Sequence, residues 1–199
     1  MAYCIIFPLG GPKYVMVKPP QVHGSKLPTY RTPVAEAPDE LVLGSKRKTL
    51  KHDLVSGFNA ILLCSGRFLG LLEEYASGQF ESKPIRILNA KREPVEAPTG
   101  FHWIRPLEVR RALVLDGGEL SQAIYRPLLS STLHFAATDI RNINCRQAVR
   151  KADIAGLGIW RDALEFPFPM RDVFVSEALG LAMQALPVIG IEYAPLIEV

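Results

Sequence analysis

The sequence predicts an α+β fold with a mixed sheet and a few helices, and three observations lead to that class. Two stretches repeat a pattern of strand, serine-capped helix and strand. Several other short apolar runs are bounded by glycine and proline, so the chain holds more strand than a helical bundle allows. Hydrophobic residues make up 48% and charged residues 22% of the 199 residues, which is ordinary globular usage and excludes disorder of the whole chain.

The two copies of the repeat begin with the apolar runs 61–65 and 172–176, which end at Ser65 and Ser176. Each serine is followed by apolar residues at offsets of three, seven and ten, which is one face of an α-helix. These residues are Phe68, Leu72 and Tyr75 in the first copy and Leu179, Met183 and Leu186 in the second. Each serine stands where an N-cap belongs, because its hydroxyl accepts from free N–H groups of the first turn. An alternative for the first copy is one longer helix over residues 55–75.

The copies are completed by strand-like runs at 85–88 and 191–193. Further strands are expected at residues 3–7, 13–18, 101–104, 109–115 and 158–161. Residues 139–153 have the alternation of a surface helix, and residues 123–133 fit a strand or a short helix.

The length fits one domain of residues 1–199, or two lobes that share a core. In the two-lobe interpretation, residues 1–90 form an N-terminal lobe and residues 91–199 a C-terminal module. Five prolines between Pro19 and Pro38 remove backbone donors, so the sequence predicts an extended surface loop there. That loop either contacts a partner or is poorly ordered.

Positive charge gathers in two segments although the formal net charge is only +3. The first is the run 44–52 and the second is the arginine-bearing stretch 139–153. Such segments either pair with an acidic partner or form solvated surface. We take as candidate interface residues Lys46, Arg47, Lys48, Lys51, Arg146 and Arg150. No aromatic residue interleaves the first run, so stacking of nucleic-acid bases is unsupported.

Motifs that carry chemistry are missing from the sequence. The glycine patterns of nucleotide-binding and hydrolase sites do not occur, and the three cysteines form neither a disulfide framework nor a metal pair. We therefore expect no cofactor, no metal and no catalysis. One alternative is a small enzyme whose site is assembled from dispersed residues such as Cys64, His102 and Asp116. A second is a nucleic-acid-binding accessory protein that uses the basic segments.

The C-terminal half resembles a known family. An aromatic–aliphatic strand (Phe101–Ile104) precedes a Gly-aliphatic-aromatic-Arg strand (Gly158–Arg161). The chain then runs through Asp172-Val-Phe-Val-Ser-Glu-Ala-Leu179 to Gly190-Ile-Glu-Tyr193. This order is similar to the eleventh immunity-protein family of bacterial polymorphic toxin and type VI secretion systems, over roughly residues 85–199. The resemblance implies a stoichiometric binder that neutralises a cognate toxin protein, with no catalytic residues.

The expected compartment is the cytoplasm. The N-terminal apolar run lacks a basic region before it and is broken by Pro8, so neither a signal peptide nor a membrane span is predicted. A membrane partner is therefore not expected, and the oligomeric state is left open.

Overall fold

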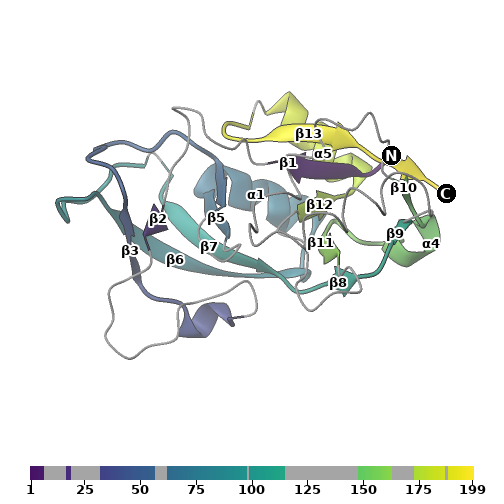
Figure 1. Cartoon of the computed structure of the whole chain (residues 1–199), viewed down its shortest axis with the longest axis horizontal. Coiled ribbons are helices and arrows are strands. Elements are labelled where there is room, and N and C mark those ends of the chain that lie inside the picture. Colours follow the sequence, from purple (N-terminus) through teal and green to yellow (C-terminus); the bar gives the residue numbers. More distant parts are fainter. Residues whose placement is uncertain are drawn as a thin grey trace, which may run out of the picture.

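The structure is a computed structural model, which describes residues 1–6, 17–18, 32–56, 62–97, 99–114, 148–162, 173–186 and 188–199. The fold is α+β, with mixed sheets and a few helices, as predicted (Figure 1). The described helices are η1 (Val34–Glu36), α1 (Gly66–Tyr75), α4 (Lys151–Ile154) and α5 (Glu177–Ala185). None of these described helices is long and apolar enough to cross a lipid bilayer.

The described strands form three sheets. The six-stranded sheet has the order β2 (Val17–Lys18), β3 (Glu40–Leu43), β6 (Phe80–Leu88), β7 (Phe101–Pro106), β5 (Leu62–Ser65) and β4 (Leu54–Ser56). The five-stranded sheet has the order β13 (Glu192–Pro195), β1 (Tyr3–Ile6), β12 (Val173–Val175), β11 (Ile159–Asp162) and β8 (Val109–Arg110). The small sheet has the order β14 (Ile197–Glu198), β10 (Ala148–Val149) and β9 (Leu113–Val114).

The repeat seen in the sequence is one part of a larger repeated unit. In the first unit, β4 and β5 pair antiparallel, α1 follows, and β7 lies between β5 and β6 with antiparallel pairing to both. In the second unit, β11 and β12 pair antiparallel, α5 follows, and β1 lies between β12 and β13 with antiparallel pairing to both. The two units differ in where the central strand comes from. It follows β6 in the first unit, whereas the chain's first strand supplies it in the second.

The registers of the two units also agree. Leu54 pairs with Cys64 in the first unit, and Ile159 pairs with Val175 in the second. One step further, the backbone N–H of Ser65 donates to the carbonyl of Asp53 (2.8 Å), and that of Ser176 donates to the carbonyl of Gly158 (3.0 Å). Asp53 and Gly158 are therefore equivalent positions of the two units.

Both serine caps form as predicted. The Ser65 hydroxyl accepts from the N–H of Phe68 (3.2 Å), and the Ser176 hydroxyl accepts from the N–H of Leu179 (3.3 Å). The alternative of one helix over residues 55–75 is wrong, because 62–65 form a strand that is buried along its whole length. The residues at offsets three and seven are fully buried in both units. The residues at offset ten are less buried, since Tyr75 is 36% exposed and Leu186 is only partly buried.

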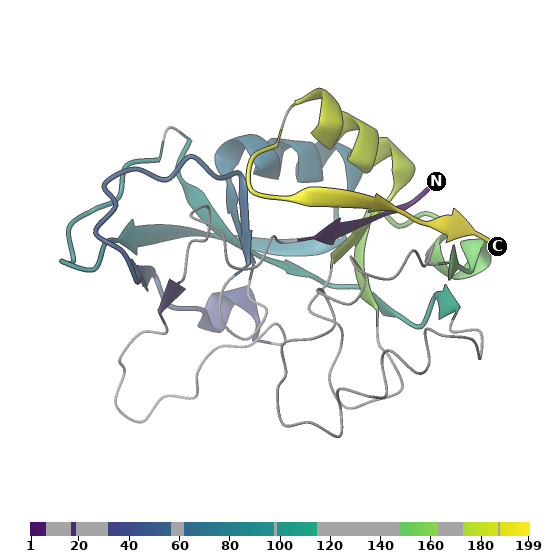
Figure 2. The same ribbon diagram turned by 45° about the horizontal axis from the view of Figure 1, so that its top comes forward.

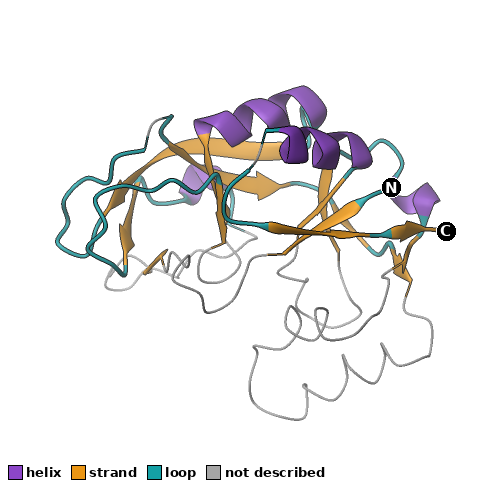
Figure 3. Ribbon diagram, turned by 90° about the horizontal axis from the view of Figure 1, so that it is seen from above, coloured by secondary structure: helices purple, strands orange, loops and turns teal. Residues whose placement is uncertain are grey.

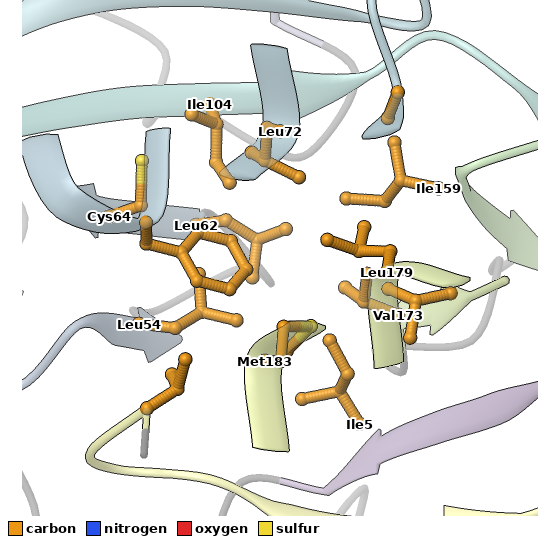
Figure 4. Packing of buried hydrophobic residues seen from close by; sticks show 14 of the residues in the cluster. Ile5, Leu54, Leu62, Cys64, Leu72, Ile104, Ile159, Val173, Leu179 and Met183 are labelled. Carbon is orange, nitrogen blue, oxygen red and sulfur yellow. The ribbon is translucent and has the colours of Figure 1, made fainter. Parts of the chain in front are cut away.

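One hydrophobic core joins the two units. Helices α1 and α5 lie side by side on the same side of the molecule (Figures 2 and 3). Their buried faces meet side chains from β4, β5 and β7 of the first unit and from β1, β11 and β12 of the second (Figure 4). A separate cluster that includes Trp103 lies under β3, β6 and η1, and another that includes Trp160 lies beside the small sheet. The units therefore share their main apolar interior.

Other boundaries differ from the sequence prediction. The sheets do not divide at residue 90, because β7 pairs with β5 and β6 while β1 pairs with β12 and β13. The predicted helix over 139–153 is wrong at 148–149, which form β10 because Val149 is buried between β9 and β14; the helix begins at Lys151. The predicted strand 109–115 is divided between β8 and β9, in different sheets. The break is fixed by the buried Ala112, whose N–H donates to Asp162 (2.9 Å).

Four predicted segments fall wholly or partly outside the described residues. Within the proline-rich stretch 19–38, residues 34–36 form one turn of 3-10 helix, and 19–31 lie outside the described part. Residues 123–133 and 139–147 lie outside it as well, and of the predicted strand 13–18 only 17–18 are described.

The two caps give a first prediction about stability. Ser176→Ala removes one cap and is expected to lower the free energy of unfolding by about 1 kcal/mol. Ser65→Ala is expected to cost more, because the same hydroxyl also donates to the buried carboxylate of Asp53 (2.7 Å). Urea unfolding followed by circular dichroism measures both, and equal losses would contradict the second role of Ser65.

Candidate functional site

Asp53 is a buried carboxylate that connects the two units. Its side chain accepts from the Ser65 hydroxyl (2.7 Å), from the Arg67 guanidinium through Nε (3.1 Å) and Nη2, and from the N–H of Ile189 (2.9 Å). Its own N–H donates to the carbonyl of Ile189 (2.9 Å). Ser65 and Arg67 belong to the first unit, whereas Ile189 lies in the turn between α5 and β13 of the second. Asp53 therefore ties the two units together.

The buried charge of Asp53 is stabilised by the hydrogen-bond donors around it. The residue is only 4% exposed, and burial raises the pKa of its carboxyl. The hydrogen bonds from Arg67, Ile189 and Ser65 outweigh that penalty, so the pKa lies below its ordinary value. The carboxyl is consequently ionised at neutral pH.

In a second contact between the units, a side chain of the first unit binds the backbone of the second. Gln79 lies in the turn between α1 and β6 and accepts through Oε1 from the N–H of Gly158 (2.6 Å). Its Nε2 donates to the carbonyl of Gly156 (2.9 Å). The turn after each helix thus binds the residue that precedes the first strand of the other unit. Gly158 has no room for a side chain, since a Cβ there would overlap the carbonyl oxygen of Tyr75.

The basic run 44–52 is followed directly by Asp53 and lies beside the loop 89–97, which belongs to the connection between β6 and β7. The N–H of Ala90 donates to the carbonyl of Ser45 (2.8 Å) and that of Glu96 to the carbonyl of Lys48 (2.8 Å). The N–H of Leu50 donates to the carbonyl of Glu96 (3.1 Å), and the Leu50 side chain is buried. The two loops lie together at one end of the molecule (Figures 1 and 3).

The tip of the second loop is organised by Asn89, which is fully buried. The Asn89 side chain accepts from the N–H of Lys91 (2.8 Å) and of Glu93 (3.1 Å), and its Nδ2 donates to the Glu93 carboxylate (2.8 Å). The N–H of Arg92 donates to the Asn89 carbonyl (2.8 Å), and Arg92 has a φ of 64°. These bonds define the backbone of the turn and direct Lys91 and Arg92 to the exterior, where both are exposed.

Six exposed cations therefore lie on the two paired loops, and we call this surface the two-loop basic face. Its members are Lys46, Arg47, Lys48, Lys51, Lys91 and Arg92. The five other than Arg47 have no salt bridge in the part of the chain that the structure describes. Cations elsewhere are paired with a carboxylate in most cases, namely Arg67, Lys83, Arg86, Arg105, Arg110 and Arg150.

The structure brings together four of the six candidate interface residues. Lys46, Arg47, Lys48 and Lys51 lie on the two-loop basic face. Arg150 precedes α4 at the other end of the molecule (Figure 1), where it is paired with Asp153 and bonds the carbonyl of Arg111. Arg146 lies outside the described residues. The two basic segments are thus not one surface as far as the structure describes them.

Sequence reasoning missed Lys91 and Arg92. They lie 39 and 40 positions beyond the end of the first basic run and carry only two charges. A usable signal was Asn89 directly after the predicted strand 85–88, since asparagine forms turns through its side chain. That a turn there would lie against residues 45–50 depends on the parallel pairing of β3 with β6, which no local pattern reveals.

The residues of the enzyme alternative are placed as follows. Cys64 and His102 are direct neighbours across β5 and β7. The Cys64 side chain is buried in the core, where desolvation raises the pKa of its thiol, the reverse of what a nucleophilic thiolate needs. Asp116 lies outside the described residues. Within the described part of the chain, no three histidine, cysteine or acidic side chains group as metal ligands do.

Asp53 gives a prediction about pH. Because its folded-state pKa lies below the unfolded value, its contribution to stability is complete above about pH 5 and is lost as the pH falls through the folded-state value. Asp53→Asn is expected to lower the free energy of unfolding by about 2 kcal/mol at pH 7. The difference between the two proteins should shrink on acidification from pH 5 to pH 2, and urea unfolding at each pH measures it. A difference that stayed constant over this range would contradict the role of the ionised carboxylate.

Comparison with known proteins adds no assignment to these residues. No model of a protein family matches the chain, and no curated protein matches it at a significant level. The resemblance described above therefore rests on the residues of the chain itself.

Proposed function

We propose that the protein is a cytoplasmic immunity protein, which binds a bacterial toxin protein and neutralises it as a stoichiometric inhibitor. The class comes from the resemblance over residues 85–199. The binding surface that we assign to it is the two-loop basic face, and the partner presents carboxylates to it. The function requires a firm scaffold with one complementary patch and needs no catalytic group.

The observation that carries this proposal is the difference between the two-loop basic face and the other cations. Most described cations away from this face have a carboxylate partner, whereas five of the six on the face have none among the described residues. Unpaired surface cations repel one another and contribute nothing to folding through ion pairs. They do raise the rate at which an acidic partner approaches and help to select it over others.

The scaffold beneath the face supports the same use. Leu50 and Asn89 anchor the two loops in the interior, and Asp53 fixes the end of the first loop to both units. An interface that is ordered before binding loses less conformational entropy when the partner arrives. The residues that carry the resemblance, such as Val173–Val175 and Leu179, are buried and belong to the scaffold.

A nucleic acid is the second candidate partner, because the same cations would also attract phosphates. One feature of the face favours a protein. No aromatic side chain interleaves the basic residues of the first loop, so bases have no stacking surface there.

The first test is co-expression with the product of the adjacent gene. The proposal predicts that the protein restores growth to cells that express this product as a toxin, and that the two proteins purify together in a fixed ratio. If growth is not restored and the two proteins do not purify together, the proposed function is wrong.

The second test reverses charge on the face. In Lys46→Glu/Lys48→Glu, the association rate with the same partner at low salt is expected to fall roughly tenfold or more. The matched control is Arg111→Glu/Lys151→Glu, an identical change of charge on exposed residues at the other end of the molecule. Its rate should stay within a factor of two, with thermal unfolding unchanged in both variants. Equal effects of the two pairs would mean that net charge matters and the face does not.

A further inference from the structure

Arg92 occupies a backbone position that disfavours it. Its φ of 64° is in the left-handed region, where the Cβ of an ordinary residue is crowded by the backbone, and it is the one described residue other than glycine that adopts a positive φ. Glycine and asparagine are the residues that this conformation normally selects. The choice of arginine therefore costs the fold stability.

The arginine side chain forms no bond that stabilises the described part of the fold. The turn is built by Asn89 and Glu93 together with the backbone N–H of Arg92, and any residue at position 92 supplies that N–H except proline. The Arg92 side chain is exposed and has no hydrogen bond or ion pair with the part of the chain that is described. A side chain that the backbone disfavours and that no described residue binds points to a contact outside the molecule.

We propose that Arg92 is the anchor of the two-loop basic face, and that its guanidinium binds a carboxylate of an acidic protein in a bidentate manner, with Lys91 beside it. This inference rests on the proposed function for the identity of the partner. A guanidinium presents paired donors that match the two oxygens of a carboxylate, whereas an ammonium acts as a point charge. The surrounding cations, Lys46 and Lys48 among them, steer the partner, and Arg92 at the tip of the turn orients it.

The probes are a fluorescein-labelled decaglutamate peptide and a labelled decathymidylate, whose binding to the whole protein is followed by fluorescence anisotropy in low salt. Arg92→Asn removes the guanidinium and keeps a residue suited to the left-handed backbone. The prediction is at least tenfold weaker binding of decaglutamate, together with a melting temperature that is unchanged or raised by roughly 2–4 °C. Arg92→Lys should bind with an intermediate affinity, since it keeps the charge and loses the fork. Arg111→Asn is the matched control and should bind like the wild type.

Several results would overturn the inference. They are decaglutamate binding by Arg92→Asn within a factor of two of the wild type, no binding by the wild type, or a fall in melting temperature that shows a structural role. Tighter binding of decathymidylate than of decaglutamate would assign the face to a nucleic acid.

The growth assay separates this inference from the proposed function. If the wild type and Arg92→Asn both restore growth with equal efficiency, the anchor is wrong and the function stands. If the wild type does not restore growth but binds decaglutamate through Arg92, the anchor stands and the immunity function is wrong.

Discussion

The buried carboxylate of Asp53 is the interaction on which the rest of the structure depends. A charge with 4% exposure is tolerated because one hydroxyl, one guanidinium and one backbone N–H bond it, and that N–H comes from the other unit. Asp53 also directly follows the basic run 44–52. The same residue thus holds the units together, secures the N-terminal end of α1 through Ser65, and fixes one end of the surface that we assign to binding. Removing its charge would disturb all three.

The repeated unit explains why the contact at Asp53 joins the turn after one helix to the start of the other unit. Two units with the same strand order place their helices against each other, and the turn after each helix reaches the position before the first strand of the other unit. Asp53 and Gly158 occupy that position. In one unit the contact is made by a buried side chain, and in the other the glycine leaves room for Tyr75 and Ala76 while Gln79 supplies the polar group. The two equivalent junctions are therefore closed by different polar groups, a carboxylate in one and a side-chain amide in the other.

The sequence predicted the helix caps and the strands next to them, and it did not predict which distant strands pair. The serine caps at Ser65 and Ser176, the strands around them and the α+β class follow from periodicity and capping, which act within a few residues. The central strand of the second unit comes from residues 3–6, and no local signal relates these to residues 173–195. Only the part of the two-loop basic face that is continuous in sequence could be predicted. Lys46 to Lys51 form a run, whereas Lys91 and Arg92 join them only through the pairing of β3 with β6.

The central claim is that the partner binds the two-loop basic face. Hydrogen–deuterium exchange of the wild-type protein, free and in complex with the purified product of the adjacent gene, tests it most directly. The account predicts that exchange slows in peptides covering residues 45–51 and 89–96, and that peptides covering α4 and the residues around Arg150 are unchanged. Slowed exchange confined to α4, or to any segment other than these two loops, would contradict it.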